Sequence, residues 1–381
     1  MIPYGQHQLD DDDIDAVVNV LRNQFLTQGQ QVPIFEQHLC TYTGSQYAVA
    51  VNSGTSGLHI ACLAAGLAAG DWLWTTPNSF VASANCARYC GAQVDFVDID
   101  PHSRNMSLSA LATKLEQASR TKRLPKVIVV VHFAGLSCDM CAVRELADKY
   151  GVILIEDAAH ALGGSYNQGK VGSCQFSDMT VLSFHPVKSI TTAEGGAVLC
   201  NDPALHHKLL LLAKHGITRD PLYMTQASHG PWYYQQIELG YNYRLSDVHA
   251  ALGNSQLAKL DQFIAKRRQV AQRYFQALQH LPLTLPPAHN HEQSAWHLYM
   301  VELQQHARKD IFAQLQARGI GVNVHYIPIH LQPYYQQQGF KPGDFPNAEA
   351  FYQNALTLPL FPGLRADDQD TVINALLEVL V

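Results

Sequence analysis

The apolar run Val-Ile-Val-Val-Val-His occupies residues 127–132. Its first five residues are β-branched, which favours an extended strand. An unbroken apolar run, rather than an alternating one, is typical of a strand that helices cover on both faces. Further short apolar runs lie at residues 48–51, 72–75, 94–97, 152–155, 180–184 and 196–199. Amphipathic segments separate these runs, so the sequence predicts an α/β fold with a seven-stranded, mostly parallel sheet between helices.

The segments between the strands show helical periodicity. Helix candidates lie at about residues 10–21, 53–63, 79–90, 107–115, 139–150 and 204–215. The pattern changes after residue 240. From residue 246 to about 281 we expect one long helix, because no Gly or Pro interrupts it after Gly253. A Pro-rich stretch follows at 282–287.

Beyond that stretch the sequence predicts a smaller α+β region. We expect strands near residues 298–303 and 321–325 and a last helix at 367–380. A chain of 381 residues also exceeds the ~250–300 residues at which single cores stop growing. We therefore predict a large domain over residues 1–245, then a long helix with a smaller C-terminal domain over residues 246–381.

Composition excludes several classes of protein. Hydrophobic residues make up 47% and charged residues 15%, which is typical of a globular chain rather than a disordered one. The formal charge of -6 argues against a nucleic-acid partner, which would require clustered Lys and Arg. No run approaches the ~20 apolar residues of a membrane span, and the start does not resemble a signal peptide. We expect a cytoplasmic protein without a membrane partner.

The eight cysteines are expected to be thiols. Cys138 and Cys141 form a C-x-x-C pair, and Cys86 and Cys90 a C-x-x-x-C pair. A structural zinc site would need a second well-spaced pair. Buried structural thiols are therefore the better interpretation, and we expect no metal site.

Two short segments carry candidate catalytic groups. Glu156-Asp157-Ala158-Ala159-His160 directly follows a predicted strand, and carboxylates at such strand ends face the ligand crevice of open α/β sheets. The alternative is that Asp157 only caps the next helix. Lys188 ends the segment Ser-Phe-His-Pro-Val-Lys and precedes the turn Thr-Thr-Ala-Glu-Gly-Gly at 191–196. A desolvated lysine is a Schiff-base nucleophile, and a facing carboxylate suits a pyridinium nitrogen.

A third segment is suited to binding phosphate. Asn-Ser-Gly-Thr-Ser-Gly at residues 52–57 follows a predicted strand and opens a helix. Glycines let the backbone approach a ligand, and a helix N-terminus presents free N–H groups to an anion. Ser183 could add a hydroxyl to the same phosphate.

Together these residues resemble the DegT/DnrJ/EryC1/StrS family of sugar aminotransferases, which belong to fold type I of the pyridoxal-phosphate enzymes. The resemblance covers essentially the whole chain. The shared motifs occur in order at residues 26–29, 35–36, 53–57, 79–82, 156–160, 183–188, 240–244, 324–326 and 358–359.

The resemblance implies roles for the residues that would contact pyridoxal phosphate. Lys188 would hold the cofactor as a Schiff base and then move the proton between Cα and the cofactor C4′. Asp157 would keep the pyridine nitrogen protonated, and Phe80 would stack on the ring. His160 stands where many relatives have Gln and would contact the ring or its 3′ oxygen. The cofactor phosphate would be bound by Thr55, Ser56 and Ser183.

The resemblance also implies a homodimer with shared active sites. Asn242, in the motif Gly-Tyr-Asn-Tyr-Arg, would reach the phosphate of the neighbouring subunit's cofactor. The alternative is that Asn242 only turns the chain before the next helix. The substrate-binding candidates are Arg244, His325 and Tyr326.

Within the family, the segment around Lys188 is most similar to the aminotransferases of pseudaminic acid biosynthesis, although many relatives have Gly where this chain has Ala193. The similarity implies transfer of an amino group from glutamate to C4 of a UDP-linked 4-keto-6-deoxy-N-acetyl hexose. The alternative is another nucleotide-linked keto sugar, carried by GDP or dTDP, since pocket loops vary around a common core.

Three other readings are disfavoured by the sequence. Non-catalytic members of the family would lack the lysine, and the family's dehydratases replace it by His, whereas Lys188 is present. A Rossmann-type dehydrogenase would show G-x-G-x-x-G after an early strand, and this chain does not.

Overall fold

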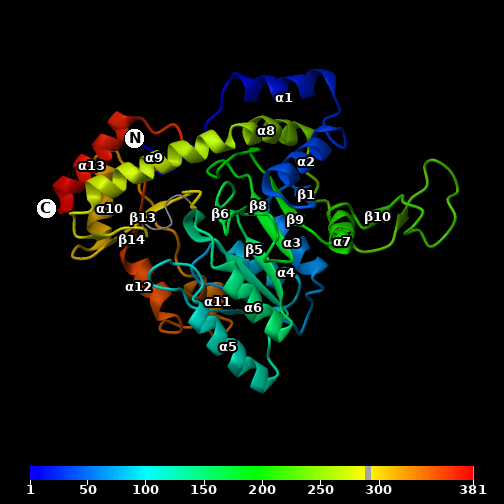
Figure 1. Cartoon of the computed structure of the whole chain (residues 1–381), viewed down its shortest axis with the longest axis horizontal. Coiled ribbons are helices and arrows are strands. Elements are labelled where there is room, and N and C mark those ends of the chain that lie inside the picture. Colours follow the sequence, from blue (N-terminus) through cyan, green and yellow to red (C-terminus); the bar gives the residue numbers. More distant parts are fainter. Residues whose placement is uncertain (288–292, 381) are drawn as a thin grey trace.

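The computed structural model describes residues 1–287 and 293–380 (Figure 1). Its centre is a seven-stranded sheet in the order β1-β9-β8-β5-β4-β2-β3. The strands are β1 (Tyr47–Val51), β2 (Trp72–Thr75), β3 (Gln93–Phe96), β4 (Val127–Val131), β5 (Ile153–Asp157), β8 (Met179–Ser183) and β9 (Gly196–Cys200). Only β9 runs antiparallel to its neighbours in this sheet. The predicted fold class is confirmed.

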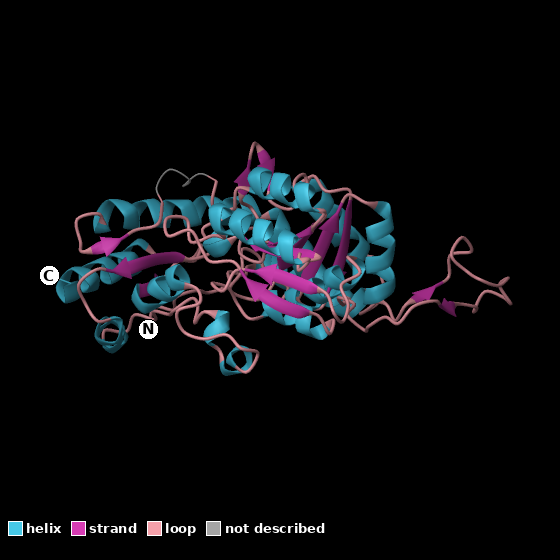
Figure 2. Cartoon of the chain, turned by 90° about the horizontal axis from the view of Figure 1, so that it is seen from below, coloured by secondary structure: helices cyan, strands magenta, loops and turns pink. Residues whose placement is uncertain are grey.

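The apolar run of β4 is explained by its two covered faces. Val127 and Val129 point into a core shared with α3 (Gly54–Ala64) and α4 (Ala82–Tyr89). Ile128 and Val130 point into the opposite core, with α5 (Leu108–Thr121) and α6 (Met140–Tyr150). Helices therefore cover both faces of the sheet, as Figure 2 shows.

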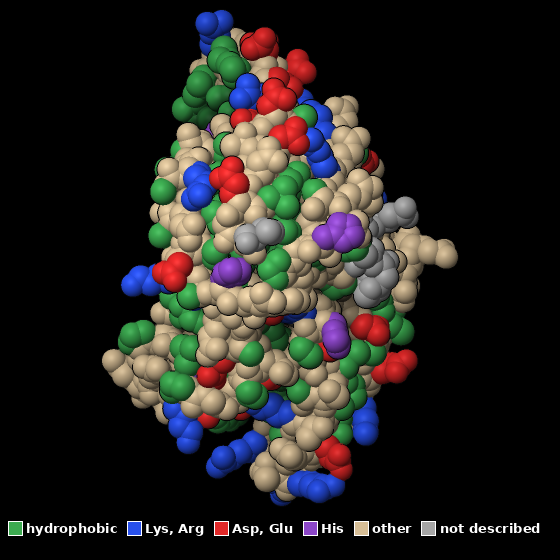
Figure 3. Space-filling model, turned by 90° about the vertical axis from the view of Figure 1, so that its left-hand side faces the viewer, with side chains coloured by type: hydrophobic (Ala, Val, Ile, Leu, Met, Phe, Trp, Pro, Cys, Tyr) green, Lys and Arg blue, Asp and Glu red, His purple; other side chains and the backbone are tan. Residues whose placement is uncertain are grey.

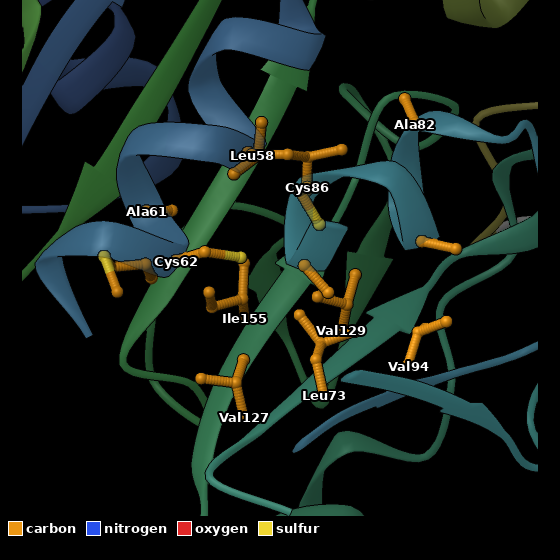
Figure 4. Packing of buried hydrophobic residues seen from close by; sticks show 14 of the residues in the cluster. Leu58, Ala61, Cys62, Leu73, Ala82, Cys86, Val94, Val127, Val129 and Ile155 are labelled. Carbon is orange, nitrogen blue, oxygen red and sulfur yellow. The ribbon is translucent and has the colours of Figure 1, made fainter. Parts of the chain in front are cut away.

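Helices α3 and α4 pack on the sheet through buried apolar side chains. Figure 4 shows Leu58 and Cys62 of α3 and Cys86 of α4 packed over Val129 and Ile155. All five side chains are 3% exposed or less. Because α3 and α4 are held this closely, their N-terminal turns occupy fixed positions at one edge of the sheet.

The predicted long helix is in fact two helices, α8 (Asp247–Ala258) and α9 (Leu260–Leu278). Lys259 lies between them, with φ −100° and ψ −4°. Its ammonium lies 3.0 Å from a carboxylate oxygen of the buried Asp13 on α1 (Asp11–Asn23), and it also pairs with Asp10. Periodicity misses this break, because the apolar pattern continues across it and the partner carboxylates come from a distant segment.

The smaller region has a three-stranded sheet of β12 (Leu283–Thr284), β13 (Tyr299–Leu303) and β14 (Ala355–Leu358). With α10 (Arg308–Ala317) and α13 (Ala366–Leu380) it encloses a second core around Val301, Leu315 and Leu376. The strand predicted at 321–325 is wrong. Gly321 instead donates to the carbonyl of Ile2, and only Asn323 bridges to β14, so pairing never extends into a ladder.

The remaining elements connect or cover these two regions. They are α2 (Gln31–Thr43), η1 (Phe133–Gly135), β6 (Ser165–Tyr166), β7 (Gly169–Lys170), α7 (Pro203–Ala213), β10 (Ile217–Thr218), β11 (Gln235–Gln236), η3 (Ile329–Leu331), α11 (Pro333–Gln336) and α12 (Pro346–Asn354).

The division at residue 245 stays a prediction. Helix α9 joins the two regions, because Phe263 and Ile264 pack in a core with α2 while Ala271 and Tyr274 pack in the core of the smaller region. Residues 288–292 and 381 of the predicted second domain lie outside the described residues.

Residues 214–240 form an arm that projects away from the sheet (Figures 1 and 2). Its only regular structure is the short antiparallel pair β10 and β11. On the face shown in Figure 3, at the opposite end of the molecule, acidic and basic side chains are interspersed. No helix in the described part of the chain combines the length and apolar character needed to cross a membrane.

Candidate active site

The C-terminal ends of β5 and β8 place the predicted catalytic groups at one edge of the sheet. Asp157 is the last residue of β5 and pairs in parallel register with Val181 of β8. Ser183, two residues beyond Val181, ends β8. The edge at the carboxyl ends of parallel strands is where open α/β sheets bind ligands.

The carboxylate of Asp157 is buried and held from two sides. Oδ2 accepts a 2.6 Å hydrogen bond from the hydroxyl of Ser83 in α4, and Oδ1 accepts from the backbone N–H of Ala159 at 3.2 Å. Ser83 is in turn paired with Ser79 at 2.7 Å. The side chain of Asp157 therefore has a defined orientation, and its residue is only 6% exposed.

The neighbouring carboxylate, Glu156, faces the other side of the sheet because successive side chains of a strand alternate. Its Oε2 lies 2.6 Å from Nε2 of His132, and its Oε1 accepts from the hydroxyl of Ser177 at 2.5 Å. Glu156 is thus a buried structural group, and the two adjacent carboxylates have different environments.

Lys188 lies in the turn that follows β8 and reaches the same region as Asp157. The turn is closed by two bonds to the carbonyl of Phe184, from the N–H of Thr192 and the hydroxyl of Thr191, each 3.0 Å long. Burial lowers the pKa of Lys188 from 10.5 to about 8, although the charge of Asp157 opposes this shift. At pH 7 about a tenth of the amine is therefore neutral, far more than for an ordinary lysine, and only the neutral amine is a nucleophile.

The start of α3 lies against Ser183. Ser53 caps the helix by accepting a 3.1 Å bond from the N–H of Ser56. A Cβ at Gly54 would lie 3.0 Å from Cβ of Ser183, so glycine is what permits this close approach. Thr55 occupies the first turn and is partly buried. The helix N-terminus, Thr55 and Ser183 thus form a cradle suited to an anion.

The hydroxyl of Ser56, a predicted phosphate ligand, is hydrogen-bonded within the turn. It donates to Oδ1 of Asn52 at 2.7 Å and lies 2.9 Å from the hydroxyl of Ser53. The hydroxyl of Ser56 therefore donates its hydrogen bond within the turn. A contact from Ser56 to a phosphate requires this hydroxyl to change partner.

Aromatic and imidazole rings line the region beside Lys188. Nε2 of His160 lies 3.2 Å from the hydroxyl of Tyr326, and the ring of Phe80 lies 6.2 Å from that of Tyr326. Phe80 is 57% exposed, which is unusual for a large apolar side chain and leaves its ring available to a ligand. Nδ1 of His160 is buried and has no hydrogen-bond partner within the described residues.

His297 was missed by the sequence prediction. Its ring centroid lies 4.3 Å from that of His160, and its Nδ1 is likewise buried without a partner in the described part of the chain. Burial and the charge of Lys188 hold the pKa values of both histidines well below the usual range. Burial also lowers the pKa of His325 to about 4, and its Nδ1 lies 2.8 Å from the hydroxyl of Thr357. All three rings are therefore neutral at neutral pH.

The segment containing Asn242 and Arg244 passes the other side of the α3 start. The backbone of Arg244 forms an isolated antiparallel β-bridge with Val51 at the end of β1. The N–H of Asn52 donates to the carbonyl of Tyr243 at 2.8 Å. Arg244 is partly buried, whereas Asn242 is exposed in the single chain. An exposed Asn242 is compatible with the predicted contact to a second subunit, which stays a prediction.

Pyridoxal phosphate requires an amine, a carboxylate for the ring nitrogen and a phosphate cradle. The site fits each requirement: Lys188 has a lowered pKa, Asp157 is buried and oriented by Ser83, and Gly54 lets the start of α3 approach Ser183. The unpaired Nδ1 of His160 provides a further polar contact for a bound ligand.

Comparisons with known proteins identify the family of this chain. The model of the DegT/DnrJ/EryC1/StrS aminotransferase family matches residues 7–377. The spore coat polysaccharide biosynthesis protein SpsC of Bacillus subtilis is 37% identical over 100% of this chain and 97% of its own. The UDP-4-amino-4,6-dideoxy-N-acetyl-beta-L-altrosamine transaminase of Campylobacter jejuni is 38% identical over 100% of this chain and 98% of its own.

Among solved structures, Helicobacter pylori PseC is described as an aminotransferase involved in the biosynthesis of pseudoaminic acid. It superposes with a TM-score of 0.90 at 33% identity, covering 100% of this chain and 99% of its own. Members of the matching family depend on pyridoxal phosphate and act on nucleotide sugars. This chain belongs to the DegT/DnrJ/EryC1/StrS aminotransferase family and is a pyridoxal-phosphate-dependent sugar aminotransferase.

Proposed function

We propose that this enzyme transfers an amino group from glutamate to C4 of a UDP-linked 4-keto-6-deoxy-N-acetyl hexose, a precursor of pseudaminic acid. The observation that carries the proposal is the 38% identity, over the full length of both chains, to a transaminase named for a UDP-linked 4-amino-4,6-dideoxy sugar. The likeness to PseC supports the same substrate class.

Lys188 and Asp157 are the proposed catalytic residues. When bound, the cofactor supplies a carbonyl carbon that accepts amines and a ring that withdraws electrons. Lys188 would hold the cofactor through its neutral amine and would move a proton at the carbon bearing the transferred nitrogen. Asp157 holds a proton at the ring nitrogen, and Ser83 keeps its carboxylate in the required orientation.

The remaining cofactor contacts are proposed from their positions. Thr55, Ser183 and, after release from Asn52, Ser56 bind the phosphate at the start of α3. Phe80 covers one face of the ring with its exposed aromatic side chain. His160, held by Tyr326, contacts the ring edge through its unpaired Nδ1.

Binding the negatively charged substrate requires a cationic side chain that does not already form an ion pair within the chain. Arg244 meets this requirement, because it is partly buried beside the phosphate cradle and pairs with no carboxylate in the described ranges. His325 and Tyr326 are proposed to contact the sugar. His325 acts there as a neutral donor or acceptor, since its pKa is about 4.

We further propose that two copies form a homodimer with shared active sites. The arm at residues 214–240 supports this proposal, because it carries several exposed large apolar side chains, a pattern that marks interaction surfaces. They are Leu222, Tyr223, Trp232, Tyr234, Ile237 and Leu239. The arm directly precedes Asn242 in the sequence, so a second subunit bound to it would lie close to the phosphate cradle.

The competing substrate is a keto sugar carried by GDP or dTDP. The 37% identity to SpsC, which bears a different functional name, keeps this alternative open. The test is to incubate the enzyme with glutamate and UDP-, GDP- and dTDP-linked 4-keto sugars and detect amine gain by mass spectrometry. Amination of the UDP-linked N-acetyl sugar at a rate at least tenfold above the others is expected. Preference for a GDP or dTDP sugar would refute the proposed substrate and leave the aminotransferase class intact.

A further inference from the structure

A fully buried arginine contacts the backbone of the catalytic lysine. Arg267 lies on α9 and is 1% exposed. Its guanidinium donates to the carbonyl of Lys188 at 3.4 Å and to the carbonyl of Leu360 at 3.2 Å. It also donates to the carbonyls of Trp296 and His297, at 3.2 and 3.4 Å. One side chain thus joins three segments that are far apart in the sequence.

The charge of Arg267 is not neutralised by a carboxylate anywhere in residues 1–287 and 293–380. Burial lowers the pKa of Arg267 to about 10, so the side chain is still protonated at neutral pH. An unpaired buried charge is costly unless dipoles compensate it. Here the compensation comes from carbonyl oxygens, and one of these belongs to Lys188.

Arg267 also stands where the two cores meet. Phe263 and Ile264, one turn earlier on α9, belong to the core beneath the Lys188 turn, whereas Ala271 and Tyr274, one to two turns later, belong to the core of the smaller region. A small pocket behind the turn is lined by Arg267, Lys188, Thr191 and Gln256 among others. The guanidinium therefore lies directly against the turn that carries Lys188.

We propose that Arg267 is a positioning residue for the aminotransferase reaction: by holding the carbonyl of Lys188 against the segments around His297 and Leu360, it keeps the lysine amine in its buried position beside Asp157. The inference rests on the proposed role of Lys188. It assigns a function to a residue on the long helical segment, remote in sequence from every motif that identified the site.

The position of the amine has a measurable consequence. The groups that face Lys188 are Asp157 from the end of β5, His160 after β5, His297 before β13 and His325, and the lowered pKa values of the three histidines leave their rings without positive charge at neutral pH. The lowered pKa of Lys188 therefore depends on burial. A turn released from Arg267 lets the amine reach water, and its pKa then rises toward the ordinary value of about 10.4.

The test measures the titration of Lys188 in the cofactor-free protein. Competitive acetylation over a pH series, quantified at Lys188 by mass spectrometry, gives the midpoint directly. Arg267→Met removes the charge and all four contacts, and Arg267→Lys keeps the charge but cannot span four carbonyls. Both variants are expected to raise the midpoint by about one pH unit or more. Arg268→Met is the matched control, because Arg268 is the next residue, is partly exposed and, among the residues that the structure describes, donates only to the carbonyl of Ser294.

A general loss of stability would lower the melting temperature of an Arg267 variant without moving the Lys188 midpoint, so thermal unfolding is measured on the same samples. If Arg267→Met does not fold, Arg267→Lys carries the test. A wild-type midpoint in a folded Arg267 variant overturns the proposal, as does an equal shift in Arg268→Met. The labelling is done on cofactor-free protein and does not require Lys188 to bind the cofactor. A failure of the proposal for Arg267 is therefore distinguishable from a failure of the proposed role of Lys188.

Discussion

The hydroxyl of Ser83 donates a 2.6 Å hydrogen bond to Oδ2 of Asp157, and both residues are buried. Ser83 lies in the first turn of α4, so the helix N-terminus also favours the negative charge of Asp157. Because α4 is packed on the sheet through Cys86, the hydroxyl is held in place relative to β5. The carboxylate is thereby oriented by the fold before any ligand binds.

Replacing Asp157 by Asn is expected to preserve folding and to reduce turnover at least tenfold. The amide cannot hold a proton at the cofactor ring nitrogen, and a charge-assisted hydrogen bond is worth about 1.5–3 kcal/mol. Glu156→Gln is the contrasting variant, because it disturbs the buried pair with His132 and should lower the melting temperature more than turnover. Turnover near the wild-type rate in Asp157→Asn would show that Asp157 only shapes the chain after β5.

Reduction with borohydride is expected to fix the cofactor on Lys188. Purified protein should absorb in the visible range, and peptide mass spectrometry after reduction should locate the adduct on this lysine alone. Lys188→Ala should lose both signals, whereas Lys309→Ala, on the exposed start of α10, should keep them. An adduct on a different lysine would contradict the assignment.

Cofactor loading is expected to depend on pH with a midpoint near 8, because the pKa of Lys188 is lowered to about 8 and only the neutral amine reacts. The loading rate of cofactor-free protein should rise about tenfold per pH unit below the midpoint and level off above it. An ordinary lysine would continue to gain rate up to about pH 10.4. Rates from absorbance after rapid mixing distinguish the two profiles.

The same shift has a consequence for stability, with a defined sign. Between about pH 8 and 10.4 the unfolded chain binds the lysine proton and the folded chain does not, so the free energy of unfolding of the cofactor-free protein rises with pH. Lys188→Met should remove this contribution. Denaturant unfolding at pH 8 and pH 10 would measure it, and an equal pH dependence in wild type and variant would show that Lys188 titrates normally.

The sheet could be predicted because its strands carry local signals. The run at β4 is apolar on both faces, and its alternate residues enter two different cores. The break at Lys259 could not be predicted, because the helical pattern continues across it and the ion-pair partners of Lys259, Asp10 and Asp13, are distant in the sequence. The prediction of a strand at 321–325 was wrong for a related reason. This segment and the residue before it form only isolated bridges with Ile2 and Thr357, which are distant in the sequence.

The site shows the same limit. Asp157 ends β5 and Lys188 lies in the turn after β8, so motif and strand end together predict their place. Ser83 and His297 act through tertiary contacts with Asp157 and His160. Ser83 had one usable signal, since it follows Ser79 by a helical turn within a predicted helix. The position of Arg267 carried no signal, because an arginine in an amphipathic helix is ordinarily solvated.

Ala193 has a left-handed backbone, with φ of 64°, in the turn that follows Lys188. This conformation costs a residue with a Cβ roughly 1–2 kcal/mol, and glycine avoids most of the cost. Ala193→Gly is therefore expected to leave the melting temperature unchanged or to raise it by a few degrees. A large fall in the melting temperature would show that the methyl group of Ala193 makes a packing contact that outweighs the backbone strain.

The shared active site can be tested by complementation between Asn242→Ala and Lys188→Ala. Each homodimer is expected to be inactive or nearly so. If Asn242 serves the cofactor bound to the other subunit's Lys188, a mixed dimer contains one site with neither lesion and one site with both. Subunit exchange should then restore activity toward one native site per mixed dimer. If each chain supplies both residues to its own site, every site of the mixed dimer carries one lesion and activity does not return.

The control mixes wild type with the double variant Asn242→Ala, Lys188→Ala, and its outcome must be the reverse. With shared sites, each site of that mixed dimer carries one lesion, so the mixed dimer is inactive. With unshared sites, the wild-type chain keeps an intact site. Activity in the first mixture and not in the control mixed dimer supports a contact of Asn242 across the subunit interface. Activity only in the control would show that Asn242, exposed in the single chain, acts within its own subunit. Native mass spectrometry of both mixtures verifies that exchange has occurred, so an inactive first mixture with confirmed mixed dimers counts against sharing.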